Sequence, residues 1–400
     1  MKAVQEHKSR LARLQRALRA NGWDGYLVTQ NVDIYYFTGS MQNGYLWVPA
    51  EGEPVFYVRR SVVRAKEEAA CEVEELGSFR GLGEKLKQRN PELLGKETPR
   101  IAAEWDVLPV QTWIRLKELV PQVQWEDGSH LVRELRMVKS PGEIAKIRES
   151  ARVIDLAFEE AVSRLRPGMT DLELVALIES IVRTHGHTGL MRMRGYNQEI
   201  VTGVVASGED AAVPTYFDGP VGGRGLSPAS PQGAGRRIIR DNEPIVIDIG
   251  CCIDGYVIDQ TRTAVVGTLP DHLVRAYRIT EHILRETEAR LKPGTVCEDL
   301  YARSLELAAE AGLADHFMGY GQDRVKFLGH GIGLEVDEYP VLARGFRYPL
   351  EPGMVIAIEP KFVFPGEGVV GIENTYAITE DGFEKLTRTR EGIIAVPNPA

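Results

Sequence analysis

An apolar segment interrupted by acidic residues, at 244–267, is the strongest constraint on how this chain folds. It reads PIVIDIGCCIDGYVIDQTRTAVVG, and the Asp-Gly dipeptide at 254–255 is typical of a two-residue β-hairpin loop. If this dipeptide forms the turn, Asp248 lies opposite Thr261, and Asp259 is a diagonal neighbour on the same face. Two carboxylates on one apolar strand pair repel each other and lose hydration, which a bound cation would offset. The hairpin taken alone slightly favours the alternative, in which one aspartate caps or turns the chain and the other is solvated.

A second segment, at 353–379, repeats the combination of apolar strands and acids. Glu359 follows the run MVIAI and Glu373 follows VVGI, on either side of the turn sequence PGEG. An apolar strand excludes a charge unless that charge is paired or bound to metal. His330, between glycines in GHGIGLEVDEYP, adds one imidazole, although a buried core histidine would fit the same sequence. Four carboxylates and one imidazole carry about the charge that two divalent cations need, and hard oxygen donors favour Mn, Co, Fe or Zn.

The N-terminal third carries no such cluster and predicts a separate α/β domain. Its first residues, up to Asn21-Gly22, have the apolar spacing of a helix. We predict strands in the next runs, which are rich in β-branched and aromatic residues: DGYLVT, NVDIYYFTGS, GYLWVP and PVFYVRR. Helical and strand-like segments then alternate, and all five tryptophans precede residue 126. With no catalytic constellation in it, this domain is expected to supply bulk, a dimer surface or a pocket wall.

The boundary of a second domain is predicted just before Ser140, which can cap a new helix whose first turn contains Pro141. Helices dominate from there to about residue 186. Strands and glycine-rich turns prevail after about residue 200, with one further helical stretch. The sequence therefore predicts one domain over residues 1–137 and another over 138–400.

Composition excludes several classes of protein. Acidic residues outnumber basic ones by 57 to 48, which argues against a nucleic-acid surface. The four cysteines have no CxxC spacing and two are adjacent, so a disulfide framework is not expected. The N-terminus carries charges where a signal peptide needs an apolar run, and no later run reaches membrane-spanning length. We expect a soluble, cytoplasmic protein with no membrane partner.

The candidate ligands occur in a characteristic order, namely Asp248, Asp259, His330, Glu359 and Glu373. This order and spacing resembles the pita-bread metallopeptidases, in the branch of prolidase, Xaa-Pro aminopeptidase and creatinase. Phrases along nearly the whole chain match as well, among them NVDIYYFTGS, LRMVKSPGEIAKIRES, VVASGEDAA and GMVIAIEP. The resemblance implies an α/β domain of the creatinase/prolidase N-terminal type, followed by an α+β pita-bread catalytic domain, in a homodimer. Creatinase keeps this fold without the five ligands, so their presence here favours a metalloenzyme.

The resemblance also implies a role for each candidate ligand. Asp259 and Glu373 would bridge two divalent metal ions. Asp248 would chelate the first ion, and His330 and Glu359 would complete the second. A bridging hydroxide would attack a peptide carbonyl, with Glu359 as general base. The implied enzyme is a Xaa-Pro dipeptidase or aminopeptidase, and its partner is a small peptide with proline at the second position.

The chain departs from the family at four positions near these ligands, one of which is Lys326, where a histidine often lies four residues before the metal histidine. Thr215 stands where relatives carry a histidine after the VASG phrase, and Asp337 replaces a second histidine seven residues beyond the metal histidine. Gly371 replaces the arginine that usually precedes the last glutamate by two. A threonine hydroxyl can still donate to an oxyanion, whereas an ionised carboxylate repels it and could bind a substrate ammonium or a nearby cation. Glu359, Asp337 and Thr215 are therefore the candidate catalytic residues.

Other residues around the candidate centre allow two interpretations each. Thr261 and Arg262 could orient the ligand carboxylates or be ordinary strand residues. The Gly- and Pro-rich segment 218–237 is longer than is usual in the family. It could be a lid or pocket wall, with contacts from Arg224, Arg236 or Arg237, or a flexible surface loop.

The missing histidines leave two alternatives to peptide hydrolysis open. One is a same-fold enzyme that acts on a non-peptide small polar metabolite, as a C–N hydrolase or a lyase. The other is a non-catalytic scaffold protein that keeps the metal for stability. Turnover of a peptide panel, turnover of metabolites, and metal content without turnover distinguish the three.

Overall fold

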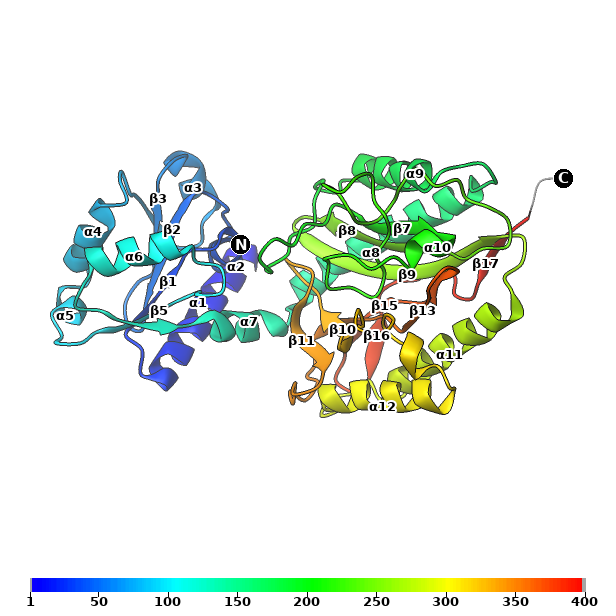
Figure 1. Cartoon of the computed structure of the whole chain (residues 1–400). Coiled ribbons are helices and arrows are strands. Elements are labelled where there is room, and N and C mark those ends of the chain that lie inside the picture. Colours follow the sequence, from blue (N-terminus) through cyan, green and yellow to red (C-terminus); the bar gives the residue numbers. More distant parts are fainter. Residues whose placement is uncertain (1, 398–400) are drawn as a thin grey trace. The chain divides into compact units, whose positions relative to one another are not determined.

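The computed structural model describes residues 2–397. The chain divides into two compact units, Met1–Arg136 and Met137–Ala400 (Figure 1). Their elements confirm the predicted class, an α/β domain followed by an α+β domain. Within residues 2–397, no helix is both long enough and apolar enough to cross a membrane.

The first unit is built on a mixed sheet. Its strands are β1 (Gly25–Val28), β2 (Gly44–Pro49), β3 (Val55–Val58), β4 (Glu72–Glu75), β5 (Arg100–Ala103) and β6 (Gln124–Asp127). They lie in the order β4-β3-β2-β1-β5-β6, with β1 antiparallel to β2 and parallel to β5. Its helices are α1 (Lys2–Asn21), α2 (Asn31–Thr38), α3 (Val62–Glu68), α4 (Gly81–Arg89), α5 (Pro91–Leu94), α6 (Val110–Leu119) and α7 (Ser129–Met137). Side chains such as Leu27, Trp47 and Val55 form its core.

One strand prediction in this unit is wrong, because NVDIYYFT forms helix α2. Six of its eight residues are buried, so no period of 3.6 is visible in its sequence. A short apolar run of this kind cannot be assigned from periodicity alone. Gly39 ends the helix at φ 86°, and its amide donates to the Tyr35 carbonyl. The buried Asp33 receives a hydrogen bond from Arg136 at 2.7 Å.

The second unit contains two sheets and a two-stranded ribbon. Its strands are β7 (Gly203–Ser207), β8 (Ile245–Ile253), β9 (Tyr256–Val266), β10 (Phe327–Gly331), β11 (Glu338–Ala343), β12 (Val355–Ile358), β13 (Lys361–Phe364), β14 (Gly368–Gly371), β15 (Asn374–Ile378), β16 (Phe383–Lys385) and β17 (Ile394–Val396). Its helices are α8 (Pro141–Ser163), α9 (Asp171–Thr184), α10 (Gly208–Ala211), α11 (Asp271–Glu288), α12 (Cys297–Glu310) and the 3₁₀ helix η1 (Ala314–His316).

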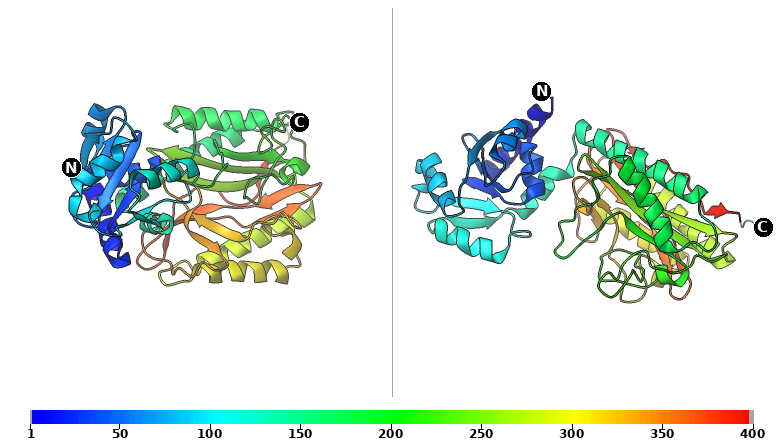
Figure 2. Two further views of the ribbon diagram at one scale, coloured as in Figure 1. Left: turned by 60° about the vertical axis from the view of Figure 1, so that its left-hand side comes forward. Right: turned by 90° about the horizontal axis from the view of Figure 1, so that it is seen from above.

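These elements form layers with the sheets inside and the long helices outside. One sheet has the strand order β17-β9-β8-β7, the other β11-β10-β12-β15-β16, and β13 pairs with β14. Helices α8 and α9 pack on the first sheet, while α11 and α12 lie beside the second sheet and the ribbon (Figures 1 and 2). Ser140 caps α8 in a reciprocal capping box with Glu143, as its sequence predicts.

The first acidic hairpin has the predicted register. Strands β8 and β9 are antiparallel, with Asp248 opposite Thr261 and the turn at residues 254–255. Both turn residues have positive φ, 50° for Asp254 and 85° for Gly255, which accounts for the Asp-Gly dipeptide. Asp259 lies two positions along β9 from Thr261, so the two aspartates converge as expected.

The second acidic hairpin changes sheets at its two glutamates. Strands β12 and β15 pair with Ile358 opposite Asn374, and β13 and β14 pair in the same register with Lys361 opposite Gly371. Glu359 and Glu373 therefore stand opposite each other between the two pairings. A single antiparallel bridge between Thr261 and Glu373 then joins this hairpin to β9. That bridge brings both acidic hairpins to one place.

Candidate metal centre

All five predicted ligands meet in the second unit. Asp248 and Asp259 come from β8 and β9, and His330 comes from β10. Glu359 directly follows β12 and Glu373 directly precedes β15. Four of them are almost completely buried, with exposures of 8% for Asp259, 5% for His330, 5% for Glu359 and 1% for Glu373. Carboxylates at this depth require a compensating charge.

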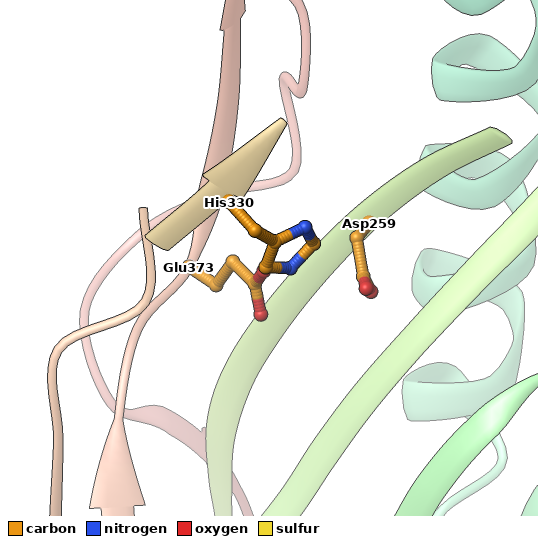
Figure 3. Close-up of side chains that lie close together, drawn as sticks. All are labelled: Asp259, His330 and Glu373. Atoms are coloured by element: carbon orange, nitrogen blue, oxygen red, sulfur yellow. The ribbon is translucent and has the colours of Figure 1, made fainter. Parts of the chain in front are cut away.

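The five side chains form two overlapping groups. Asp259, His330 and Glu373 point toward one another, and each offers a ligand atom within 4.8 Å of the others (Figure 3). Asp248, Glu359 and Glu373 form the second group by the same criterion. Glu373 belongs to both groups and so joins the two halves of the centre. The burial of Asp259, with the nearby charges of Glu373 and Asp248, raises the pKa of its carboxyl well above the ordinary value.

His330 is oriented with one ring nitrogen toward the centre. Its Nδ1 lies 3.0 Å from the carbonyl oxygen of Gly331 and 3.4 Å from Oδ1 of Asp337. Because the carbonyl can only accept, Nδ1 carries the proton, and Nε2 keeps its lone pair. Nε2 lies 3.8 Å from Oε1 of Glu359. Burial lowers the pKa of His330, but the charges of Asp337, Glu359 and Glu373 outweigh it and raise the pKa above the ordinary value.

Lys361 is a charged residue at this centre that the sequence reasoning did not single out. Its side chain has no exposed surface, and Nζ lies 2.5 Å from Oε2 of Glu359, 3.1 Å from Oε2 of Glu373 and 3.3 Å from Oδ2 of Asp248. Burial lowers the pKa of the ammonium, but the charges of these carboxylates raise it well above the ordinary value. The sequence does contain a sign of this burial. Lys361 is a charged residue at the start of the apolar run KFVF, just as Glu359 and Glu373 are charged residues at the ends of apolar runs.

Thr261 and Arg262 support the centre in different ways. The hydroxyl of Thr261 donates to Oε2 of Glu373 at 2.7 Å, so it does orient a ligand carboxylate. Arg262 contacts the main chain instead, and its Nη1 donates to the carbonyl oxygens of Thr261 and Glu373 at 2.8 and 2.7 Å. It therefore fixes the bridge between the two hairpins rather than a carboxylate.

A cavity opens on this centre, and the predicted substrate residues lie differently around it. Asp248, Asp259, His330, Glu359 and Asp337 line the cavity, and residues 217–221 of the Gly- and Pro-rich region form one wall. Thr215 lines a neighbouring pocket instead, and its Oγ1 accepts a hydrogen bond from the Phe217 amide at 3.1 Å. The geometry thus supports a role for Thr215 in holding that wall, not in contacting an oxyanion.

None of the three arginines suggested for this cavity lines it. Arg224 pairs with Asp210 at 2.9 Å, and Nη2 of Arg237 donates to Glu243 at 2.6 Å. Arg236 is not among the residues that line the cavity. Of the segment 218–237, only residues 218–221 and Gln232 line the cavity, and its arginines do not reach the centre.

The half of the centre around His330 fits a divalent cation. Asp259, His330 and Glu373 supply two carboxylates and one imidazole, a donor set suited to first-row metals. Oε1 of Glu373 is buried and has no hydrogen-bond partner within residues 2–397, although its other oxygen accepts from Thr261 and Lys361. A buried carboxylate oxygen without a partner is costly, and a bound cation would satisfy it.

Known proteins resemble the chain over both units. The sequence profile described as metallopeptidase family M24 matches residues 145–380, and that of the creatinase/prolidase N-terminal domain matches residues 10–138. The chain is 28% identical over 389 residues to the Xaa-Pro dipeptidase of Pyrococcus furiosus, across 97% of this chain and 100% of that protein.

Solved structures show the same likeness. The Xaa-Pro dipeptidase from Bacillus anthracis has a TM-score of 0.82 at 27% identity, over 98% of this chain and 100% of that one. The X-Pro aminopeptidase from Thermotoga maritima has a TM-score of 0.78 at 26% identity, over 96% and 99%. These matches confirm the expected two-domain fold.

Proposed function

This chain belongs to metallopeptidase family M24, and from that membership we propose that it hydrolyses the peptide bond before a proline. The substrate would be a Xaa-Pro dipeptide or a peptide with proline at the second position. The observation that carries the proposal is the convergence of four carboxylates and one imidazole in one centre, four of which line the same cavity. The activities of the named relatives support the choice of substrate. The homodimer and the cytoplasmic location stay predictions.

Asp259, His330 and Glu373 are the residues that would hold the catalytic cation. Glu359 Oε1, which lies 3.8 Å from Nε2 of His330, is placed to join them. One imidazole among oxygen donors favours Mn, Co, Fe or Zn. A bound divalent cation supplies Lewis-acid chemistry, because it lowers the pKa of water and polarises a peptide carbonyl.

The chain's own residues would move the proton and position the substrate. Glu359 lines the cavity, and Lys361 holds only its Oε2, so Oε1 can accept a proton from the attacking water and return it to the leaving amine. Phe217, Pro220 and Phe327 give the cavity an apolar wall that suits a proline ring. The cavity thus combines acidic groups that can act on the peptide bond with an apolar wall that can contact the proline ring of a Xaa-Pro peptide.

A peptide panel after chelation tests this function. We expect the metal-free protein to be inactive, and Mn, Co or Zn added separately to restore release of proline from Xaa-Pro dipeptides. Matched Xaa-Ala dipeptides are the control, and we expect them to react more slowly because they lack the ring. Turnover of polar metabolites without peptide hydrolysis, or bound metal without any turnover, would contradict the proposal.

Asp337 can be tested as the residue that orients His330. Asp337→Asn should weaken divalent-metal affinity by roughly 10-fold or more, the usual effect of removing a carboxylate beside a ligating histidine. Asparagine retains the shape and tolerates the φ of 64° at this position, so the backbone should not change. Calorimetric titration of the metal-free protein measures the affinity.

Asp218→Asn is the matched control for this variant, because Asp218 lines the same cavity. Its metal affinity should stay close to that of the wild type. Equal affinities for the Asp337 variant and the wild type would show that Asp337 does not orient the ligand.

A further inference from the structure

Lys361 occupies one of the two groups of acids in the centre. The three carboxylates around Nζ are those of Asp248, Glu359 and Glu373, which are also the three members of the second potential metal group. An ammonium has three N–H donors, and three carboxylate oxygens lie within 3.3 Å of this one. The donors and acceptors match, so this group already holds a cation that belongs to the chain.

Gly371 makes room for this lysine. It lies directly opposite Lys361 in the β13–β14 ribbon. A Cβ atom built on Gly371 would lie 2.4 Å from Cγ and 2.9 Å from Cβ of Lys361, so a larger residue cannot share the space. The absence of a side chain at position 371 therefore leaves the space that the Lys361 side chain fills.

A second metal ion would compete directly with the ammonium. Carboxylate oxygens bind first-row divalent ions at about 2.0–2.2 Å. An ion held by Asp248, Glu359 and Glu373 would need the same oxygens that contact Nζ, and it would lie within a few ångströms of another positive charge. Repulsion between two close cations in a buried site is strong. This half of the centre therefore does not fit a metal ion while Lys361 is charged and in place.

Glu359 and Glu373 each turn one carboxylate oxygen toward Lys361 and the other toward the His330 half of the centre. Glu373 gives Oε2 to Lys361 and keeps Oε1 without a partner, and Glu359 gives Oε2 to Lys361 and keeps Oε1 near His330. The free oxygens, with Asp259 and His330, belong to the half that fits a divalent ion.

We propose that this centre binds a single divalent cation in the His330 half, and that the Lys361 ammonium takes the place of the second. The inference rests on the proposed metallopeptidase function and replaces the two-ion site that the resemblance implies. Lys361 is a positioning residue in this arrangement: it fixes one oxygen each of Glu359 and Glu373. Asp248 binds the lysine and is not a metal ligand.

Metal stoichiometry tests the proposal without relying on activity. Metal-free protein is titrated with Mn(II), and bound ions are measured by elemental analysis and by the electron paramagnetic resonance spectrum. We expect one ion per chain, with the sharp hyperfine pattern of an isolated Mn(II). Lys361→Met removes the charge and should raise the stoichiometry to two, with the spectrum of a coupled pair. Two ions on the wild type, or none, would overturn the proposal.

A pair of aspartate variants keeps the test decisive if Lys361→Met does not fold. Asp248→Asn should still bind one ion with an affinity within a few-fold of the wild type, whereas Asp259→Asn should lose the ion. Equal losses in both variants would make Asp248 a ligand and contradict the proposal. One bound ion without Xaa-Pro hydrolysis would defeat only the proposed function, and two ions with hydrolysis would defeat only this inference.

Discussion

Glu373→Gln should lower kcat/KM for Xaa-Pro hydrolysis by at least about 1000-fold, more than the loss of a single oxyanion donor costs in other hydrolases. Glu373 is the one side chain that belongs to both acidic groups, and it is 1% exposed. Glutamine has the same shape but no charge. Its amide would have to place an N–H donor toward either Lys361 or the cation, and both contacts are repulsive.

The same substitution should reduce bound metal as well as activity. The unpartnered Oε1 of Glu373 is the oxygen that the His330 half of the centre offers, so its replacement removes a charged ligand from a set of three. Metal content after dialysis and kcat/KM at saturating metal separate weak binding from poor catalysis.

Glu367→Gln is the matched control, because Glu367 lies in the turn of the same hairpin. Its carboxylate is exposed and pairs with His272 at 2.6 Å, and it is not among the residues that line the cavity. This variant should keep wild-type activity and metal content. A Glu373→Gln enzyme within 10-fold of the wild type would remove Glu373 from the mechanism that we propose.

The acidic hairpins could be predicted because local chemistry determines them. Asp254 and Gly255 need positive φ in a tight turn, and this turn alone sets the register that places Asp248 opposite Thr261. Glu359 and Glu373 were visible as charges at the ends of apolar runs. In these cases the burial of a strand and the cost of a charge on it are both readable from sequence.

Features that depend on packing between distant segments could not be predicted. The role of Lys361 requires the register that sets it opposite Gly371 and the bridge that brings Asp248 near. Asp337 was expected to contact substrate or to pair with a nearby cation, and nothing in the sequence indicated that its carboxylate lies 3.4 Å from Nδ1 of His330. Helix α2 was mistaken for a strand because the unit buries six of its eight residues, which leaves no helical period in the sequence.

Arg262→Met should destabilise the second unit by more than about 3 kcal/mol, since each buried acceptor left without a donor costs roughly 1–3 kcal/mol. Arg262 has no exposed surface and follows Thr261 in strand β9. Its guanidinium donates, at 2.7–2.9 Å, to the carbonyl oxygens of Thr261, Glu373, Thr389 and Arg390 and to Oδ1 of Asn374. Methionine fills much of the volume but donates to none of them.

Urea unfolding of metal-free protein measures this effect without a contribution from bound metal. Arg152→Met is the control, because Arg152 is an exposed arginine of α8 that pairs with Glu149 on the helix surface, and it should change stability by less than about 0.5 kcal/mol. A stability loss for Arg262→Met no larger than that of the control would mean that the bridge between Thr261 and Glu373 holds without the guanidinium. The expected large loss would instead make Arg262 the residue that ties the two acidic hairpins together, and so a condition for the centre to form.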